Sequence, residues 1–199
     1  VMNQVYLDDE YLKSVWKDNY IDNINKIKTA VLETHNEYLE YDGEVIDAMF
    51  FSTSVGYTEN SEEVFTSKLP YLRSVSSTWD EISPVYEVNY TFSLDEFYSK
   101  LDIPYQSTIK LETIQTTSTG RIKEINDVLF AGSTVVTKLN LKSNHFTINQ
   151  DGESVYITTK GYGHGVGMSQ YGAQGMALNG YSYEEILMHY YQGTSIKKI

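Results

Sequence analysis

His164 is surrounded by glycine, which occupies every second position from 161 to 167. Glycine is used where the backbone needs a positive φ or where another group must approach it closely. Because the neighbouring residues have no side chains, we expect few walls around the imidazole, which would then be open to hydrogen-bond and orient a ligand oxygen. The other interpretation is a tight packing corner around a core histidine.

The residues after His164 predict the start of a helix. Ser169 is a favourable N-cap residue, and the free amides of a first helical turn favour an oxygen-rich or anionic partner. We therefore interpret the run 161–175 as one side of a binding site. Its candidate ligand contacts are Tyr162, His164, Ser169, Gln170 and Tyr171.

A second candidate stretch follows Phe50 and Phe51, where the chain changes from apolar residues to hydroxyl, amide and glycine residues. Hydroxyl and amide groups both donate and accept hydrogen bonds, as sugar hydroxyls do. A solvated connection is the alternative interpretation. The candidate contacts here are Ser52, Ser54, Tyr57 and Asn60. We predict that 52–60 and 161–175 meet in space and form one wall of a groove.

The composition excludes some partners and cofactors. A net charge of −12 argues against nucleic acid, which needs Lys and Arg to neutralise its phosphates, but is compatible with a neutral glycan. The eighteen tyrosines suit the flat faces of carbohydrates, although many will serve in the core. The chain has no cysteine, and its four histidines lack metal-ligand spacing, so we expect neither a metal nor another cofactor. No apolar run approaches the roughly 18 residues of a membrane span.

Hydrophobic periodicity and capping signals predict one α+β domain over residues 1–199, with several packed helices and short, largely antiparallel strands. Helices are predicted at 7–17, 22–34, 94–101 and 134–141, and after the capping box that begins at Ser182. Strands are predicted at 38–41 and 45–52, joined by an Asp-Gly turn, and at 109–116, 120–126, 128–131 and 155–159.

The run Gly-Tyr-Gly-His-Gly-Val-Gly-Met-Ser-Gln-Tyr-Gly-Ala from 161, with Ile-Leu-Met-His-Tyr-Tyr-Gln-Gly-Thr from 186, resembles the carboxyl-terminal signature of the stage II sporulation protein D family. Phe-Ser-Thr-Ser at 51–54 and Thr-Glu-Asn-Ser at 58–61 resemble a second motif of that family. Its members are lytic transglycosylases of bacterial spore formation. The resemblance covers nearly the whole chain, but only the later part of the family's catalytic domain.

The resemblance implies cleavage of the bond between N-acetylmuramic acid and N-acetylglucosamine in peptide-stripped glycan strands, with a 1,6-anhydro product. A single carboxylic acid suffices, because the nucleophile is the C6 hydroxyl of the substrate itself. The family places this glutamate in a Glu-Met-Pro segment, which the resemblance puts upstream of Val1 and so not among residues 1–199. The catalytic residue is therefore unassigned, and we expect this chain alone to be inactive. Glu59 is the nearest substitute.

The resemblance also implies a setting. It places the activity in septal peptidoglycan remodelling and engulfment, outside the cytoplasm between the forespore and mother-cell membranes. It implies a membrane anchor that is absent from residues 1–199. The implied partners are peptidoglycan strands, a sporulation amidase (stage II sporulation protein P) and a membrane scaffold.

Two other classes of function compete with this interpretation. The chain could be a peptidoglycan-binding module without catalysis, since the predicted binding loops do not need the missing glutamate. It could instead be an unrelated hydrolase that uses His164 with Ser52, Ser54 or Ser169 as nucleophile. No Gly-x-Ser-x-Gly elbow surrounds any of these serines, which disfavours the hydrolase.

Overall fold

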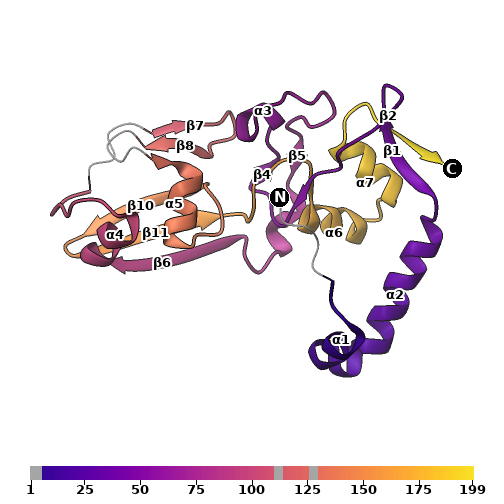
Figure 1. Ribbon diagram of the computed structural model, residues 1–199, viewed down its shortest axis with the longest axis horizontal. Helices are drawn as coiled ribbons and strands as arrows, with labels where there is room; N and C mark the ends of the chain where they lie inside the picture. The colour runs from indigo at the N-terminus through magenta and orange to yellow at the C-terminus, as the bar shows by residue number, and fades with distance from the viewer. Residues whose placement is uncertain (1–5, 110–113, 126–129) are drawn as a thin grey trace. The chain divides into compact units, whose positions relative to one another are not determined.

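The computed structural model describes residues 6–109, 114–125 and 130–199 (Figure 1). They divide into two compact units. The smaller unit runs to Tyr38 and includes Ile196–Ile199, and the larger unit is Leu39–Ser195. The predicted α+β class, with short and largely antiparallel strands, is confirmed. That residues 1–199 form one domain stays a prediction.

In the smaller unit, two α-helices lie within the described residues from Tyr6 onward. Helix α1 spans Asp9–Trp16, a 3₁₀ turn spans Lys17–Asn19, and α2 spans Tyr20–Glu33, so the helices predicted at 7–17 and 22–34 are confirmed. The Asp8 carboxylate accepts a hydrogen bond from the Tyr11 N–H at 2.8 Å and so caps α1; aspartate is a favoured residue at this N-cap position. Neither helix contains a buried residue. Among the described residues, no helix is long and apolar enough to cross a membrane.

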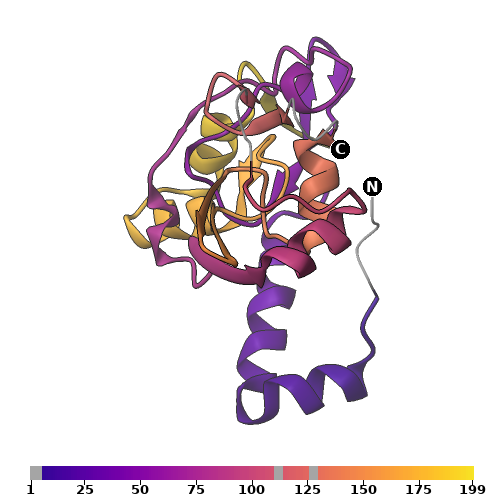
Figure 2. The same cartoon turned by 90° about the vertical axis from the view of Figure 1, so that its left-hand side faces the viewer.

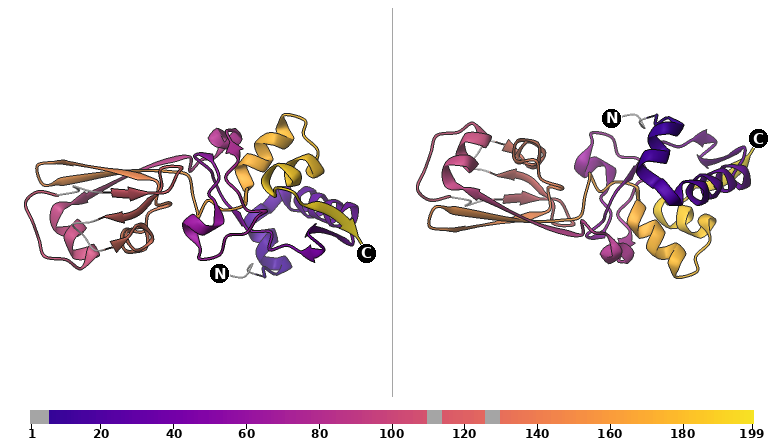
Figure 3. Two further views of the ribbon diagram at one scale, coloured as in Figure 1. Left: turned by 90° about the horizontal axis from the view of Figure 1, so that it is seen from above. Right: turned by 90° about the horizontal axis from the view of Figure 1, so that it is seen from below.

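One part of the larger unit is an antiparallel sheet with the strand order β10-β11-β6, packed with two helices (Figures 2 and 3). The elements are β6 Glu87–Ser93, α4 Leu94–Leu101, α5 Gly132–Leu139, β10 Phe146–Asp151 and β11 Ser154–Lys160. A second antiparallel sheet comprises β7 Ile114–Thr116, β8 Ile122–Ile125 and β9 Phe130–Ala131.

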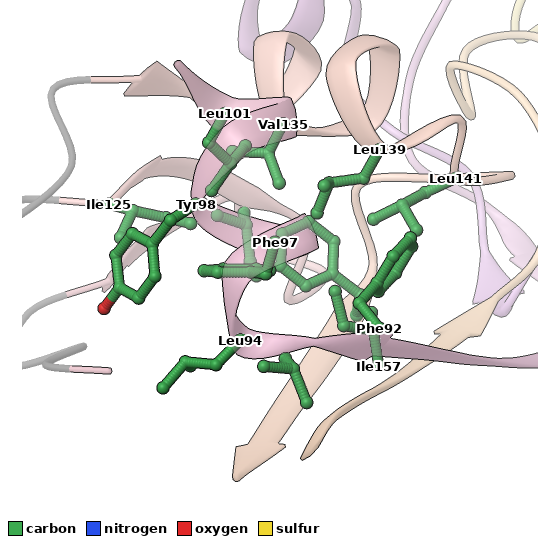
Figure 4. Packing of buried hydrophobic residues seen from close by; sticks show 13 residues of the cluster. Phe92, Leu94, Phe97, Tyr98, Leu101, Ile125, Val135, Leu139, Leu141 and Ile157 are labelled. Atoms are coloured by element: carbon green, nitrogen blue, oxygen red, sulfur yellow. The ribbon is translucent and has the colours of Figure 1, made fainter. Parts of the chain in front are cut away.

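The core of this part follows from the strand register. Val155 lies opposite Phe92, and Ile157 lies opposite Tyr90, so alternate residues of β11 point into the core. Figure 4 shows Phe97 of α4 among the apolar side chains from these strands and from α5. Burial of these side chains removes apolar surface from water, the main favourable term in folding.

The other part of the larger unit contains the two stretches of interest. Its helices are α3 Ser61–Val64, a 3₁₀ turn Trp79–Ile82, α6 Gln170–Leu178 and α7 Tyr183–Tyr190. Its short strands are β2 Glu44–Val45, β3 Phe50–Phe51, β4 Gly56–Tyr57, β5 Ser76–Ser77 and β12 Met168–Ser169. Strands β1 Glu37–Tyr41 and β13 Ser195–Lys198 each span the boundary between the two units.

Helices with local capping signals were predicted well. The Ser93 hydroxyl accepts the Glu96 N–H, and α4 has the predicted bounds. The capping box of Ser182 and Glu185 is present in both directions at the start of α7. The helix predicted at 134–141 is α5, which begins two residues earlier and ends two earlier. A cap needs only neighbouring residues, so sequence alone identifies it.

The strands were predicted less completely. The single strand predicted at 45–52 is wrong, because the chain turns where the Met49 N–H donates to the Asp47 carbonyl, leaving β2 and β3 as separate pairs of residues. The strands predicted at 109–116, 120–126, 128–131 and 155–159 correspond to β7, β8, β9 and β11, with 110–113 and 126–129 outside the described residues. Strands β6 and β10 were missed, although β6 alternates polar and apolar residues.

Gly167 sits where the chain enters β12 alongside β3. The two strands are parallel, with Met168 opposite Phe50 and Ser169 opposite Phe51. Gly167 has φ +80°, and a Cβ added there would lie 2.0 Å from the Met49 carbonyl oxygen. Any side chain would therefore push the two strands apart.

We expect Gly167→Ala to lower the free energy of unfolding more than Gly180→Ala. Gly180 has φ +87° and no atom within 4 Å of an added Cβ, so its variant carries only the left-handed backbone cost of about 1–2 kcal/mol. The alanine at 167 adds a clash with backbone. Urea unfolding of both variants measures the difference, and equal losses would show that the clash is relieved without cost.

Candidate functional site

The two candidate stretches are joined through their backbones. Thr53 and Tyr162 exchange hydrogen bonds, with N–H to carbonyl distances of 3.0 and 2.9 Å. The Glu59 N–H donates to the Gly165 carbonyl at 2.7 Å, and the Tyr171 N–H donates to the Ser52 carbonyl at 3.0 Å. The predicted meeting of 52–60 and 161–175 is confirmed. That they form one wall of a groove stays a prediction, because the described lining of the pocket beside them includes no residue of 52–60.

An open pocket of about 340 Å³ lies beside this junction. The glycine run and the segment that follows α5 supply one set of lining residues, and α3 and α5 supply another. The lining residues are Val64, Ser133, Val136, Thr137, Leu141, Lys142, Ser143, Asn144, Tyr162, Gly163 and His164. The volume suits a small ligand or one or two sugar rings, and apolar walls with a few polar groups are typical of ligand sites.

His164 is half-buried in the pocket wall. Its Nδ1 accepts the Val166 N–H at 3.1 Å, so the proton of the neutral ring resides on Nε2. Burial lowers the pKa of the imidazole, and a hydrogen bond with the Phe50 backbone opposes that shift. The ring centroid lies 5.8 Å from that of Phe51 and 5.5 Å from that of Phe65. The expectation of an imidazole without side-chain walls is therefore wrong, because two rings from elsewhere in the chain enclose it.

A buried ion pair that we did not foresee lies behind the glycine run. The side chains of Arg121 and Glu59 have no exposed surface, and Nε of the arginine lies 3.2 Å from Oε1 of the glutamate. Arg121 Nη1 also donates to the Gly163 carbonyl at 2.8 Å and to Asn144 Oδ1 at 3.1 Å, while the Thr119 hydroxyl donates to the glutamate. The arginine thus fixes two of the residues that line the pocket.

The burial of this pair affects both groups. Burial raises the pKa of Glu59 although Arg121 acts in the opposite direction, and it lowers the pKa of Arg121 although Glu59 opposes it. Gly165, at φ +86°, passes directly over the guanidinium, where an added Cβ would lie 2.8 Å from Nε.

The catalytic acid is not found at Glu59. This residue, suggested above as a substitute acid, has no surface with which to reach a substrate in this structure. We correct that suggestion to a structural role. The family's own glutamate is expected upstream of Val1, and Val1 itself lies outside the described residues. The position of the catalytic glutamate therefore stays a prediction.

Two of the predicted serine contacts are buried around Asp80. The Ser54 N–H donates to the Asp80 carboxylate at 2.7 Å, and the Ser169 hydroxyl donates to the same oxygen. The Ser54 hydroxyl donates to the Tyr57 carbonyl at 3.0 Å, and the Ser169 hydroxyl also accepts the Gly172 N–H as the predicted N-cap of α6. Neither serine has exposed surface for a ligand, so we do not retain them as contacts.

The same hydrogen bonds argue against the serine hydrolase. In the part of the chain that the structure describes, none of Ser52, Ser54 and Ser169 hydrogen-bonds to His164. A serine nucleophile needs a base within hydrogen-bond reach. The described residues also contain no group of three or more His, Asp or Glu side chains arranged to hold a metal ion.

The remaining predicted contacts are distributed around the junction. Tyr162 lines the pocket with 41% of its surface exposed, and Tyr57 is 56% exposed on β4. Gln170 is exposed, and Tyr171 is half-buried at the start of α6. Asn60 is half-buried, and its side chain accepts the Ser74 N–H at 3.0 Å. Of the predicted contacts, Tyr162 and His164 line the pocket, and their roles toward a ligand stay predictions.

Comparison with known proteins identifies the family. No family model matches the chain. Stage II sporulation protein D of Bacillus amyloliquefaciens is 44% identical over 200 residues, which cover 99% of this chain and 58% of that protein. The protein of the same name from Bacillus subtilis is 41% identical over the same shares, and the amidase enhancer of B. subtilis is 30% identical over 87% of this chain and 32% of its own length. The chain is thus related to Bacillus sporulation proteins. It belongs to the stage II sporulation protein D family and spans about three fifths of the length of the two relatives with that name.

We expect Arg121→Met to lower the free energy of unfolding by about 3–5 kcal/mol, because it leaves Glu59 as an uncompensated buried charge. Adding Glu59→Gln removes that charge and should restore part of the loss. As a control, Lys160→Met breaks an exposed pair with Glu87 at 3.7 Å and should cost less than about 1 kcal/mol.

The decrease in the free energy of unfolding caused by Arg121→Met should also depend on pH. Without the arginine, burial raises the pKa of Glu59 further, so the folded protein holds a proton that the unfolded chain has released. The stability of the variant relative to the parent should then improve from about pH 8 to about pH 5. Urea unfolding at both values measures this. A pH-independent loss, unrelieved by Glu59→Gln, would show that lost packing and not charge is responsible.

Proposed function

We propose that residues 1–199 form the glycan-binding part of a peptidoglycan lytic transglycosylase of spore formation. The enzyme would cleave N-acetylmuramic acid–N-acetylglucosamine bonds in peptide-stripped strands and release a 1,6-anhydro product. The names of the relatives support a role in sporulation and the cell wall. The observation on which the proposal depends is the open pocket beside the junction, with Tyr162 and His164 of the second stretch in its wall.

The chemistry of the pocket suits a sugar. A pyranose ring has apolar C–H faces and a rim of hydroxyls, and the pocket combines apolar Val64, Val136 and Leu141 with hydroxyls of Ser133 and Thr137. The ring of Tyr162 offers a flat apolar surface with a polar edge. These groups would hold the strand by its faces and by its hydroxyls together.

His164 would orient the substrate without protonating the leaving oxygen. Its lowered pKa keeps the imidazole neutral at physiological pH, and Nδ1 is occupied by the Val166 N–H. Nε2–H remains to donate to a substrate oxygen if the Phe50 backbone bond is exchanged. The general acid needs a carboxyl with a raised pKa in a covered cleft. We infer that the Glu-Met-Pro segment supplies it from outside residues 1–199.

The proposed enzyme class also suggests where the protein acts and with which partners. We propose that the enzyme acts outside the cytoplasm on the septal wall during engulfment, anchored to a membrane, with an amidase that strips the peptides and with a membrane scaffold. The second candidate is a peptidoglycan-binding module without catalysis. It is favoured by one observation: of the lining residues within 6–109, 114–125 and 130–199, none is Asp or Glu.

Replacing Tyr162 tests the binding site. We expect Tyr162→Ala to weaken binding of peptide-free glycan by roughly three- to tenfold, because an aromatic contact contributes about 0.5–1.5 kcal/mol. Tyr162→Phe retains the ring and should lose less. Tyr156, which is 45% exposed on β11, provides a control of similar exposure, and Tyr156→Ala should bind as the parent does. Calorimetric titration measures the affinities, and an equal effect at both tyrosines would refute the site.

Incubation with peptide-free strands tests the division between binding and catalysis. We expect residues 1–199 to bind the strands and to release no 1,6-anhydro product, since the implied glutamate is not among them. Mass spectrometry of the digest detects that product, and a known lytic transglycosylase serves as positive control. Release of the product by this chain would require another carboxyl as the acid, and the activity of the Glu59→Gln variant, shown to be folded by a thermal melt, would then show whether Glu59 is that acid.

A further inference from the structure

The charge of the pocket differs from that of the protein. The chain has 27 Asp and Glu residues against 15 Lys and Arg, for a net charge of −12. Among the described residues that line the pocket, none carries a carboxylate, and one, Lys142, is a cation. A cation without a neighbouring carboxylate attracts negative groups to the pocket, whereas carboxylates elsewhere on the surface repel them.

Lys142 is held at the pocket by its backbone and by its side chain. Its carbonyl accepts the Gly163 N–H at 3.1 Å, which ties it to the residue before His164. Its Nζ lies 4.7 Å from the centre of the Tyr162 ring. A cation over an aromatic face is held in place while keeping its full charge. In the described part of the protein, no carboxylate forms an ion pair with Lys142.

The other polar groups around the pocket leave this charge uncompensated. His164 is neutral, as its lowered pKa indicates. Arg121, behind Gly163 and Asn144, is balanced by Glu59 within the buried pair. Among the described lining residues, the uncompensated charge is therefore the ammonium of Lys142, which lies over the ring of Tyr162 in the same wall as His164.

We propose that Lys142 binds a carboxylate of the glycan, namely the lactyl carboxylate of N-acetylmuramic acid. This rests on the proposed function, because it concerns the same pocket. Of the two sugars in the strand, muramic acid alone carries a carboxyl group. While a stem peptide is attached, that carboxyl is a neutral amide, and hydrolysis of the amide releases it as an anion. A cation at this point distinguishes stripped strands from substituted ones by charge as well as by size, through a charge-assisted hydrogen bond.

Three tetrasaccharides of equal length test this inference by calorimetric titration of the 199-residue chain. One alternates N-acetylglucosamine and N-acetylmuramic acid with free lactyl carboxylates, the second has those carboxylates converted to methyl amides, and the third contains N-acetylglucosamine alone. We expect the free acid to bind roughly tenfold more tightly than the other two. The preference should shrink as salt is added, because salt screens the ion pair.

Variants at Lys142 locate the source of the preference. Lys142→Gln should remove most of the difference between the free acid and the methyl amide, whereas Lys142→Arg should keep it. Lys160→Gln, which changes a lysine paired with Glu87 away from the pocket, should behave as the parent does. Thermal melts of each variant show that it is folded.

The outcomes separate the inference from the proposed function. Equal binding of all three tetrasaccharides by the parent chain would overturn the inference and leave glycan binding intact. A preference that survives in folded Lys142→Gln would overturn the role of this lysine. Failure of the parent to bind any of the three would overturn the proposed function and the inference with it.

Discussion

The burial of Arg121 with Glu59 is the constraint on which the site depends. Moving a single charge out of water costs several kcal/mol, so each of these groups requires the other and as many backbone partners as it can reach. The arginine meets part of this need through Nη1, which donates to the Gly163 carbonyl and to Asn144, whereas its buried Nη2 has no hydrogen-bond partner. Both acceptors belong to the wall of the pocket. The buried arginine therefore helps to position the pocket wall, in addition to the side chains that a ligand would contact.

The alternating glycines have a different role from the one that the sequence suggested, and one of them, Gly165, serves the buried pair directly. They do not leave His164 bare, since Phe51 and Phe65 pack against its ring. They allow other groups to come close. An added Cβ at Gly161 would lie 2.7 Å from the Thr53 carbonyl oxygen, and one at Gly165 would lie against the guanidinium of Arg121. The unusual run borders the pocket, where a site was predicted, but its glycines are explained by close packing against backbone and side chains from elsewhere in the chain.

The sequence could predict features that depend on neighbouring residues, but not those that depend on contacts between distant parts of the chain. Ser93, Ser169 and Ser182 each cap a helix through an amide three residues away, so their roles could be predicted from neighbours alone. The two-residue strands β3 and β12 exist because they pair with each other, and no local pattern defines strands so short. The burial of Glu59 could not be foreseen either. A glutamate in a polar stretch is usually solvated, and its partner lies far along the chain.

The hydrogen bonds around Asp80 have a consequence for the order in which the protein can form during synthesis. The carboxylate is shared by Ser54, Ser77 and Ser169, and the Ser169 hydroxyl also reaches the Ser52 carbonyl across 117 positions of sequence. A ribosome must therefore translate past α6 before the first of the two stretches acquires its partner. Contacts of such long range form late, because the intervening loop must be closed first. The emerging chain therefore cannot join the two stretches, and the junction beside the pocket forms only after the second stretch has been synthesised.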